Sequence, residues 1–551
     1  MSDDKLAEQK LAMLDQQLSL FSGLLDKLQT YKTLKNDAQK SLLIGSVTKQ
    51  LESELQKIRA QLGKLRQFAK PGDLNNVPEL PPHLIPNREL FKQIATRLMA
   101  KAGADGQKPP VVIEAVSGIG KSVLATAIAR NTNVRQIFMD GIFWITLGQQ
   151  PDILENQVRL IYTLSGSMPS SFESEDCANQ LGELTRTRAC LFIFDDVYDM
   201  QDVFAFNVQG EHCQILVTTM VKDLLNILQY FSPNAKGYQL KAFPETQAIE
   251  FFLNTLNDPK VTIENAPMRM NMLARLCNYS PMILKLMASY LREQSHDMWK
   301  DAFETLQNPD FEFPENHPTT LSQALHMNVE MLGEEGDYYL TLAVFVDHTR
   351  IPQVVVAMLW RYLYQISNDR IYPFIDELAE KGLLEIDAEY ISLHSFQYDY
   401  LTQEAELDKL HTHLLAAYRR SCDQHGWVSG PNDGYFFENL CLHLYYANRK
   451  GELKTLLLDF DWMYNKLQVA PLYTLINDYE LFAEEDELAI EAVKNALYSA
   501  ASIVAQRVEE LPVEILNRLW EKRNIPEVQS ILNQAQELCP DWRWEDEFPE
   551  I

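Results

Sequence analysis

Three things that the sequence has little of exclude several classes of protein at the outset. Basic residues come first: there are 49 Lys and Arg against 77 Asp and Glu, so the formal net charge is −28. Nucleic acids and anionic membrane surfaces are bound through clusters of Lys and Arg, and the sequence contains no such run. We therefore expect no nucleic-acid partner and no attachment to anionic membranes.

Long apolar runs are the second absence. None approaches the roughly 20 residues that a membrane-spanning helix needs, so we expect no membrane insertion. The N-terminus, MSDDKLAEQK, is acidic and polar, which is not the pattern of a secretory signal. The sequence thus predicts a soluble cytoplasmic protein, and export into another cell as an effector stays open.

Cysteine is the third feature of which the sequence has little. There are seven, an odd number, and their spacing fits neither a metal site nor a disulfide framework. We expect reduced, mostly buried thiols. What the chain does have is length: 551 residues, 46% of them hydrophobic, are enough for roughly three to five folded domains. We predict domains over 1–70, 71–242, 243–316, 317–420 and 421–551.

The segment 1–70 is typical of paired helices. Apolar residues recur there every seven positions, which buries one stripe of a helix against a partner helix. These residues are Leu11, Leu18 and Leu25, and then Ile44, Leu51, Ile58 and Leu65. Either the two helices form an antiparallel hairpin packed on itself or on the body of the protein, or they form an interaction or oligomerisation module.

The remaining segments predict a multidomain α/β plus α protein. After a proline-rich linker at 71–86, short apolar runs alternate with helical stretches up to about residue 242. Apolar strands separated by helices indicate a parallel sheet covered on both faces. We expect these strands at 111–116, 142–147, 190–194 and 215–217. From 243 onward the pattern is helical, with a small helical domain, a winged-helix domain whose wing is a hairpin at 382–393, and a C-terminal helical domain.

A glycine-rich loop that runs from Ala115 to Ser122 carries the strongest functional signal. It follows a predicted strand and precedes a predicted helix, as the G-x-x-x-x-G-K-[ST] phosphate-binding pattern requires. Glycines let backbone N–H groups turn toward phosphate oxygens, and the start of the helix adds the positive end of its dipole. Lys121 should reach the β- and γ-phosphates, and Ser122 should bind Mg²⁺. The candidate nucleotide-binding residues are Ser117, Gly118, Ile119, Gly120, Lys121, Ser122 and Val123.

Two carboxylates supply the second half of the site. Asp195 and Asp196 follow the apolar run 190–194, about seventy residues after Lys121. Asp195 would hold Mg²⁺ through a water molecule, and Asp196 would orient or deprotonate the attacking water while Lys121 acts on the phosphate. Two aspartates after a strand can also be no more than a helix cap. Together with the glycine-rich loop they predict that ADP or ATP is bound with Mg²⁺.

The two motifs and their surroundings resemble the NB-ARC branch of the signal-transduction (STAND) P-loop ATPases. The resemblance extends from residue 78 to about 480 and includes the segments 141–145, 212–219, 279–282, 392–395 and 456–462. It implies that Pro281 lies against the adenine and that His394 contacts the β-phosphate of ADP from the winged-helix domain. That contact would tie two domains together. The alternatives are a helix start for Pro281 and a hydrogen-bonded core residue for His394.

The sequence also departs from the family pattern. Ala115 stands where the family has the first glycine of the loop, and Met220 stands where it has the arginine that senses the γ-phosphate. Ser395 replaces the aspartate that follows the histidine, and Asn87 replaces the arginine of the linker. A thioether cannot donate to phosphate, so hydrolysis should be slow. We also expect the 4–69 helices in place of the family's recruitment domain, and no propeller.

Two functions follow from the resemblance. The first is a switch that closes on ADP and, after exchange, binds a partner protein or forms a homo-oligomer. The second is an ADP-locked scaffold that binds another protein through its N-terminal or C-terminal helices. An ordinary ATPase with a chemical substrate is a third, less favoured interpretation, because no second catalytic constellation occurs. The acidic tail at 536–551 either docks its aromatics on the last helices or is a partner motif or export signal.

Overall fold

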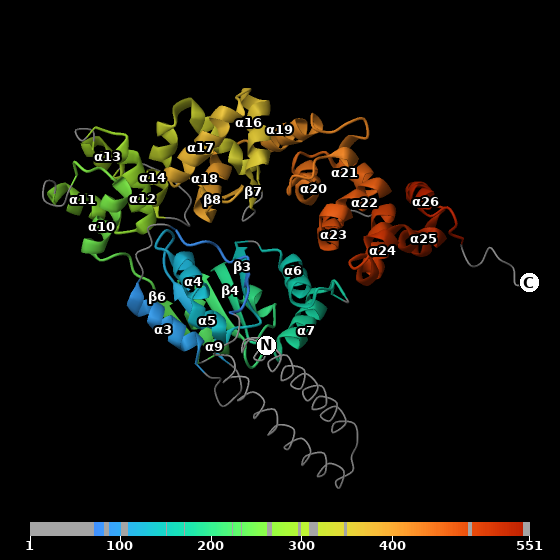
Figure 1. Cartoon of the computed structure of the whole chain (residues 1–551), viewed down its shortest axis with the longest axis horizontal. Coiled ribbons are helices and arrows are strands. Elements are labelled where there is room, and N and C mark those ends of the chain that lie inside the picture. Colours follow the sequence, from blue (N-terminus) through green and yellow to red (C-terminus); the bar gives the residue numbers. More distant parts are fainter. Residues whose placement is uncertain are drawn as a thin grey trace, which may run out of the picture.

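The structure is a computed structural model, and it describes most of the chain beyond residue 70. The described residues are 71–81, 87–100, 108–149, 151–169, 171–222, 224–232, 234–261, 267–295, 299–307, 318–345, 350–482 and 487–543. The predicted helices of 4–69 lie outside this part of the chain, as do Trp544 and Phe548 of the acidic tail. In Figure 1 a sheet domain lies below an arch of helices that runs from α10 to α26.

A parallel sheet forms the centre of the first domain, as the sequence predicts. Its strand order is β1-β3-β4-β5-β2-β6, and each of its strand pairs is parallel. The strands are β1 (Leu74–Asn75), β2 (Val111–Glu114), β3 (Gly141–Gly148), β4 (Cys190–Val197), β5 (Gln214–Thr219) and β6 (Lys236–Gln239). Strand β4 continues past the apolar run, so both aspartates belong to it.

Helices cover both faces of the sheet, because both faces are apolar. Alternate residues of a strand point to opposite faces: Leu191 and Ile193 belong to one core, and Phe192 and Phe194 to the other. The first face is covered by α3 (Arg88–Leu98), α4 (Lys121–Ala129) and α5 (Thr132–Ile137). Over the second lie α6 (Ile153–Ser165), α7 (Ser174–Thr185), α8 (Met200–Phe204) and α9 (Leu224–Phe231).

A small group of helices follows the sheet. It consists of α10 (Glu245–Leu256), α11 (Pro267–Leu276), α12 (Pro281–Arg292) and α13 (Trp299–Thr305). Helix α12 packs against α10 on one side and against α14 (Thr319–Met331) on the other. Since Pro281 is the first residue of α12, the start of this helix is fixed where proline is tolerated best.

The winged-helix segment contains the predicted hairpin. Strands β8 (Glu385–Asp387) and β9 (Tyr390–Ser392) pair antiparallel, and β7 (Ile351–Pro352) adds a third strand. Ala388 sits in the turn with a φ of 54°. The helical elements here are α14, η2 (Gly333–Glu335), α15 (Gly336–Leu340), η3 (Thr341–Val344), α16 (Gln353–Tyr364), α17 (Asn368–Glu380), α18 (Ser395–Glu404) and α19 (Leu407–Arg419).

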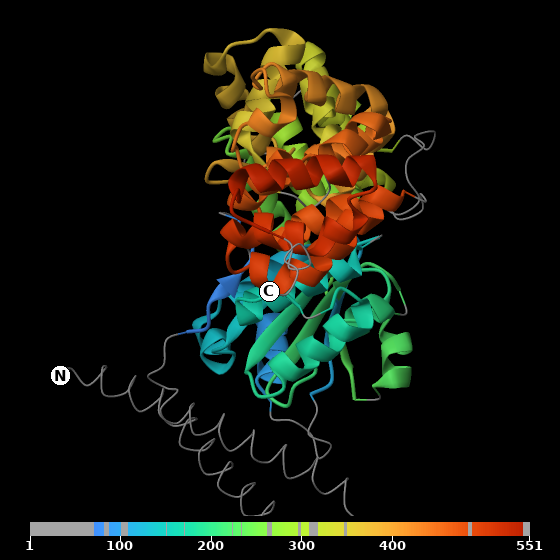
Figure 2. The same ribbon diagram turned by 90° about the vertical axis from the view of Figure 1, so that its right-hand side faces the viewer.

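The last helices return to the sheet domain. They are η4 (Gly426–Ser429), α20 (Phe436–Tyr446), α21 (Lys450–Leu457), α22 (Phe460–Val469), α23 (Leu472–Glu480), α24 (Leu488–Val504), η5 (Val508–Glu510), α25 (Leu511–Leu519), η6 (Trp520–Lys522) and α26 (Pro526–Leu538). Helix α23 packs on α6, and in Figure 2 the orange and red C-terminal helices lie directly above the sheet domain. The ring centroids of Phe172 and Tyr498 are 4.8 Å apart. Trp542 of the tail docks on Trp520, with ring centroids 5.0 Å apart.

Across the described ranges, no helix combines the length and the apolar character that crossing a membrane demands.

Candidate nucleotide-binding site

The glycine-rich loop connects β2 to α4, which begins at Lys121. Gly118 and Gly120 have φ values of 78° and 101°, a left-handed conformation that favours glycine. A Cβ on Gly120 would meet no atom within 4 Å, whereas one on Gly118 would lie 3.1 Å from Met282 Cβ. The loop is therefore open at Gly120 and closely packed at Gly118.

Ala115, in place of the first glycine of the motif, is accommodated without strain. It is not among the described residues with positive φ, and its N–H donates to the Thr219 carbonyl over 3.1 Å, which extends the β2–β5 pairing by one residue. A glycine is needed only where φ is positive or space is lacking. This departure from the motif therefore leaves the loop intact.

Lys121 is a buried cation at the start of α4. Its Nζ donates to the Val116 carbonyl over 3.3 Å, and its side chain is 8% exposed. Burial lowers the pKa of Lys121, while the nearby carboxylates of Asp196 and Asp195 oppose that shift. A buried ammonium beside a helix start is suited to hold a phosphate, whose negative charge would offset the cost of burial.

Ser122 and Asp195 are brought into contact, as the sequence predicts for a metal site. Ser122 Oγ donates to Asp195 Oδ1 over 2.9 Å, and the same oxygen accepts from Thr218 Oγ1 at 2.5 Å. Burial raises the pKa of Asp195, and the two hydroxyl donors counteract part of that shift. A hydroxyl and a carboxylate side by side are ligands that Mg²⁺ prefers, so the residues present fit the metal.

One carboxylate oxygen of Asp196 accepts no hydrogen bond from the described residues of the protein. The φ of Asp196, 56°, is rare for a residue other than glycine, and its N–H donates to Thr218 Oγ1 over 3.0 Å. Its Oδ2 is buried without a hydrogen-bond partner. A strained residue with an orphaned carboxylate oxygen near Lys121 is typical of a group that holds a water or a ligand.

The side chain that follows the last residue of β5 cannot donate to a phosphate. Met220 follows Thr219, and its sulfur accepts from the Tyr198 hydroxyl over 3.3 Å. Thr219 Oγ1 donates to the Val197 carbonyl, so this hydroxyl is engaged as well. The expected sensing arginine is thus replaced by a side chain that can only accept.

The start of α12 is bonded directly to the glycine-rich loop. The Gly118 carbonyl accepts from Ser280 Oγ over 3.0 Å and from the Met282 N–H over 3.2 Å. Pro281 lies between these two donors at the helix start. Its contact with adenine stays a prediction, but its neighbours already join the two domains. The segment 279–282 is part of the resemblance, but sequence reasoning did not predict that Ser280 and Met282 contact the loop.

His394 precedes α18 and is paired with a carboxylate. Its Nε2 lies 3.1 Å from Glu385 Oε1, and its side chain is 36% exposed. Burial alone would lower the pKa of His394, but the Glu385 carboxylate more than offsets this, so the pKa is raised, with a smaller upward contribution from Asp195. His394 lowers the pKa of Glu385 to about 2. Its contact with phosphate stays a prediction.

Asn87 has a structural role in place of the linker arginine. It is the N-cap of α3, and its Oδ1 accepts from the Leu90 N–H over 3.1 Å. Asparagine is among the best residues at this position. Helix α3 therefore begins at Arg88 for a local reason.

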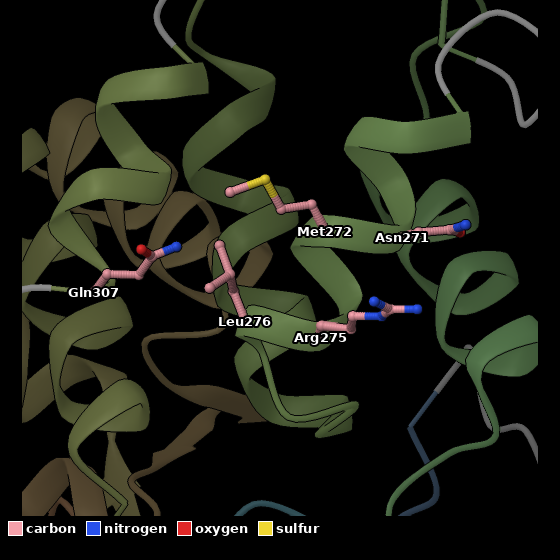
Figure 3. Close-up of a pocket in the computed structure, with 5 residues that line it drawn as sticks. All are labelled: Asn271, Met272, Arg275, Leu276 and Gln307. Atoms are coloured by element: carbon pink, nitrogen blue, oxygen red, sulfur yellow. The ribbon is translucent and has the colours of Figure 1, made fainter.

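A separate surface hollow lies on the small helical group (Figure 3). It has a volume of about 470 Å³ and is lined by Asn271, Met272, Arg275, Leu276 and Gln307. The lining residues come from α11 and from the end of the α13 segment, and none belongs to the glycine-rich loop. The hollow is therefore distinct from the phosphate site.

The parallel sheet, the glycine-rich loop before α4, and the Ser122–Asp195 pair define a P-loop nucleotide-binding protein. Comparison with protein families makes this specific: the NB-ARC domain matches residues 87–261, and the APAF-1 helical domain matches 407–514. The chain thus contains an NB-ARC domain, the nucleotide-binding domain of a signalling family, followed by a helical domain of that type.

Curated relatives agree. Apoptotic protease-activating factor 1 of zebrafish (Danio rerio) is 24% identical over 80% of this chain and 35% of its own length. The mouse (Mus musculus) protein of the same name is 26% identical over 73% of this chain and 33% of its own length. A probable disease resistance protein of Arabidopsis thaliana is 24% identical over 55% of this chain and 36% of its own length. The chain spans about a third of the length of these relatives.

Proposed function

We propose that this protein is an adenine-nucleotide-controlled signalling switch that closes on ADP. The nucleotide would lie on the glycine-rich loop, with Lys121 on its phosphates, and Ser122 and Asp195 are the residues that would hold Mg²⁺. Mg²⁺ would supply charge neutralisation at the phosphates. Exchange of ADP would open the domains and permit binding of another protein or homo-oligomer formation. A cytosolic place of action, as for a signalling protein, is part of the proposal.

One observation carries this proposal: two further domains converge on the phosphate-binding loop. The Gly118 carbonyl accepts two hydrogen bonds from the start of α12, and His394 of the winged-helix segment is within electrostatic reach of Asp195. A ligand seated there would contact all three domains. Binding energy that differs between closed and open arrangements is what a ligand-controlled switch requires.

Slow hydrolysis is part of the proposal. Asp196 would orient or deprotonate the attacking water, since its Oδ2 has no protein partner. At the end of β5, however, Met220 offers a sulfur that accepts from Tyr198. An arginine on the transferring phosphate is worth about 10³-fold or more in rate. Without it, bound ATP should be hydrolysed slowly, and the site lacks an arginine contact that would favour ATP over ADP.

The same Met220–Tyr198 contact favours a second candidate function, an ADP-locked scaffold. In that case the nucleotide is a structural cofactor, and the protein binds another protein through the segment 4–69 or the C-terminal helices. The two candidates share the site and differ in whether ADP exchanges.

The experiment that tests the proposal identifies the nucleotide carried by the purified protein. The full chain is denatured and the released nucleotide is separated by chromatography, with Lys121→Ala as the control. We expect stoichiometric ADP in the wild type and none in the variant. Exchange against Mg-ATP, followed by size-exclusion chromatography, then separates the candidates: exchange with a change in assembly supports the switch, and no exchange over hours supports the scaffold. A wild-type protein that neither carries nucleotide nor binds Mg-ATP would refute both.

A further inference from the structure

Charged side chains from two domains meet beside the candidate phosphate site. Glu385 lies on β8, His394 precedes α18, and Lys285 comes from α12. Lys285 passes close to the wing: a Cβ added to Gly382 would lie 2.9 Å from Lys285 Cε. Burial lowers the pKa of Lys285, and the attraction of Glu385 opposes this. The wing carboxylate thus faces a cation from α12 as well as the imidazole.

The main chain around His394 is held by a separate residue. Gln397 is fully buried; its Oε1 accepts from the His394 N–H over 2.9 Å, and its Nε2 donates to the Gly382 carbonyl over 2.8 Å. Gln397 therefore fixes the start of α18 and the base of the wing together. These two bonds do not involve the ring nitrogens of His394, although the capping box at the start of α18 also directs the Gln397 N–H toward the His394 side chain. The orientation of the ring at Nε2 depends on another partner.

That partner is Glu385. The residue that follows His394 is Ser395, which has no carboxylate, whereas Glu385 Oε1 lies 3.1 Å from His394 Nε2 across the hairpin. A carboxylate bound to one ring nitrogen fixes both the orientation of an imidazole and which nitrogen carries the proton.

We propose that Glu385 is a positioning residue for His394: from the wing it orients the imidazole and holds its second proton, so that a cation rather than a neutral ring faces the bound nucleotide. The inference rests on the proposed function in one respect, the contact of His394 with the nucleotide. Hydrogen bonds from a charged donor to phosphate are about twice as strong as neutral ones. The wing would thereby control how long ADP stays bound.

The first test measures release of labelled ADP from the full chain. Glu385→Gln keeps the shape of the side chain and removes its charge, and Asp387→Asn is the matched control, because Asp387 lies on the same strand and pairs with Arg350 instead. We expect Glu385→Gln to speed ADP release roughly tenfold, the lower end of what a charge-assisted hydrogen bond contributes. The control should release ADP as the wild type does.

A double-mutant cycle separates positioning from a general effect on the fold. In the His394→Ala background, Glu385→Gln should change the release rate no further, since its partner is gone. An equal acceleration in both backgrounds would overturn the proposal. So would slower release in the single variant, because Glu385 would then compete with the nucleotide for the imidazole.

The second test does not require nucleotide. Histidine ring carbons are labelled, and the His394 signal, assigned by its loss in His394→Ala, is followed through a pH titration. The charged groups that face the ring are Glu385, Lys285 and Asp195. Glu385→Gln should lower the midpoint of the His394 titration, and an unchanged midpoint would refute the proposal. Glu385→Asp keeps the charge but shortens the side chain, and it is used if Glu385→Gln does not fold. Its His394 titration midpoint should be higher than that of Glu385→Gln, and it should release ADP faster than the wild type.

The outcomes distinguish the two levels of the argument. If the wild type binds no nucleotide, the proposed function fails, and the titration alone still decides whether Glu385 controls the charge of His394. If ADP is bound but neither Glu385 variant affects its release or the titration, the proposed function stands and the role of Glu385 is wrong.

Discussion

Thr218 offers a sharp test of the candidate site, because its hydroxyl joins both aspartates. Its Oγ1 donates to Asp195 Oδ1 and accepts from the Asp196 N–H, and the side chain is fully buried. Thr218→Val removes the hydroxyl with almost no change of shape. A hydrogen bond to a charged group is worth about 1.5–3 kcal/mol and a neutral one about 1 kcal/mol. We expect a loss of about 3 kcal/mol in the free energy of unfolding.

The matched control is the next residue. Thr219 is equally buried and also makes two hydrogen bonds, but with main-chain groups, those of Val197 and Val221. Thr219→Val should therefore destabilise the protein without disturbing the aspartates. By thermal unfolding, Thr218→Val should lower the melting temperature of the sheet domain by roughly 6–12 °C, at 2–4 °C per kcal/mol for a domain of this size.

The decisive assay is Mg²⁺-dependent nucleotide binding. With Thr218→Val, Asp195 loses the donor that aligns it with Ser122, so the gain in nucleotide affinity on adding Mg²⁺ should fall about tenfold or more, as expected for one lost charge-assisted hydrogen bond. Thr219→Val should keep that gain. If both variants lose it equally, or if Thr218→Val keeps it, the assignment of Asp195 to the metal is wrong.

Three further predictions address other parts of the structure. Gly118→Ala should lower stability by about 1 kcal/mol from its left-handed φ alone and should weaken ADP retention, because its Cβ would crowd Met282; unchanged retention would show that the loop does not need its contact with α12. Lys466→Met should cost about 3–5 kcal/mol in chemical unfolding, since it leaves Asp478 as an unpaired buried charge, and Lys466→Met with Asp478→Leu should recover much of that loss. The Glu385–His394 pair should stabilise the fold fully between about pH 4.5 and pH 6.5. Glu385, with its lowered pKa, loses its contribution as pH falls through about 2, and His394 loses its contribution as pH rises through its own raised pKa, which lies above 6.5. Urea unfolding of the wild type and of Glu385→Gln across this pH range measures the difference in the free energy of unfolding. Because both side chains are partly exposed, that difference should be small. A difference that grows at alkaline pH would contradict the prediction.

Local rules account for much of what the sequence predicted correctly. Apolar runs such as 190–194 offer no polar face to water and alternate with helical stretches, which predicts strands of a covered parallel sheet. A glycine-rich stretch between a predicted strand and a predicted helix indicates that Lys121 and Ser122 lie at the start of that helix. The NB-ARC resemblance followed from the order of such motifs, and the family comparison confirms it. The hairpin of the wing followed from two short apolar runs around Asp387 and Ala388.

Tertiary structure alone decided which side chains from different elements meet. Glu385 and His394 are nine residues apart and belong to different elements, and no periodicity relates them. Gly118 is bonded by Ser280, 162 residues further on, and Thr218 reaches both aspartates only because β5 lies beside β4 in the sheet. Local sequence fixes secondary structure through backbone conformation and periodicity, but contacts between distant segments depend on how whole faces pack together. The sequence therefore determined where a nucleotide could bind, and the packing of three domains determined what surrounds it.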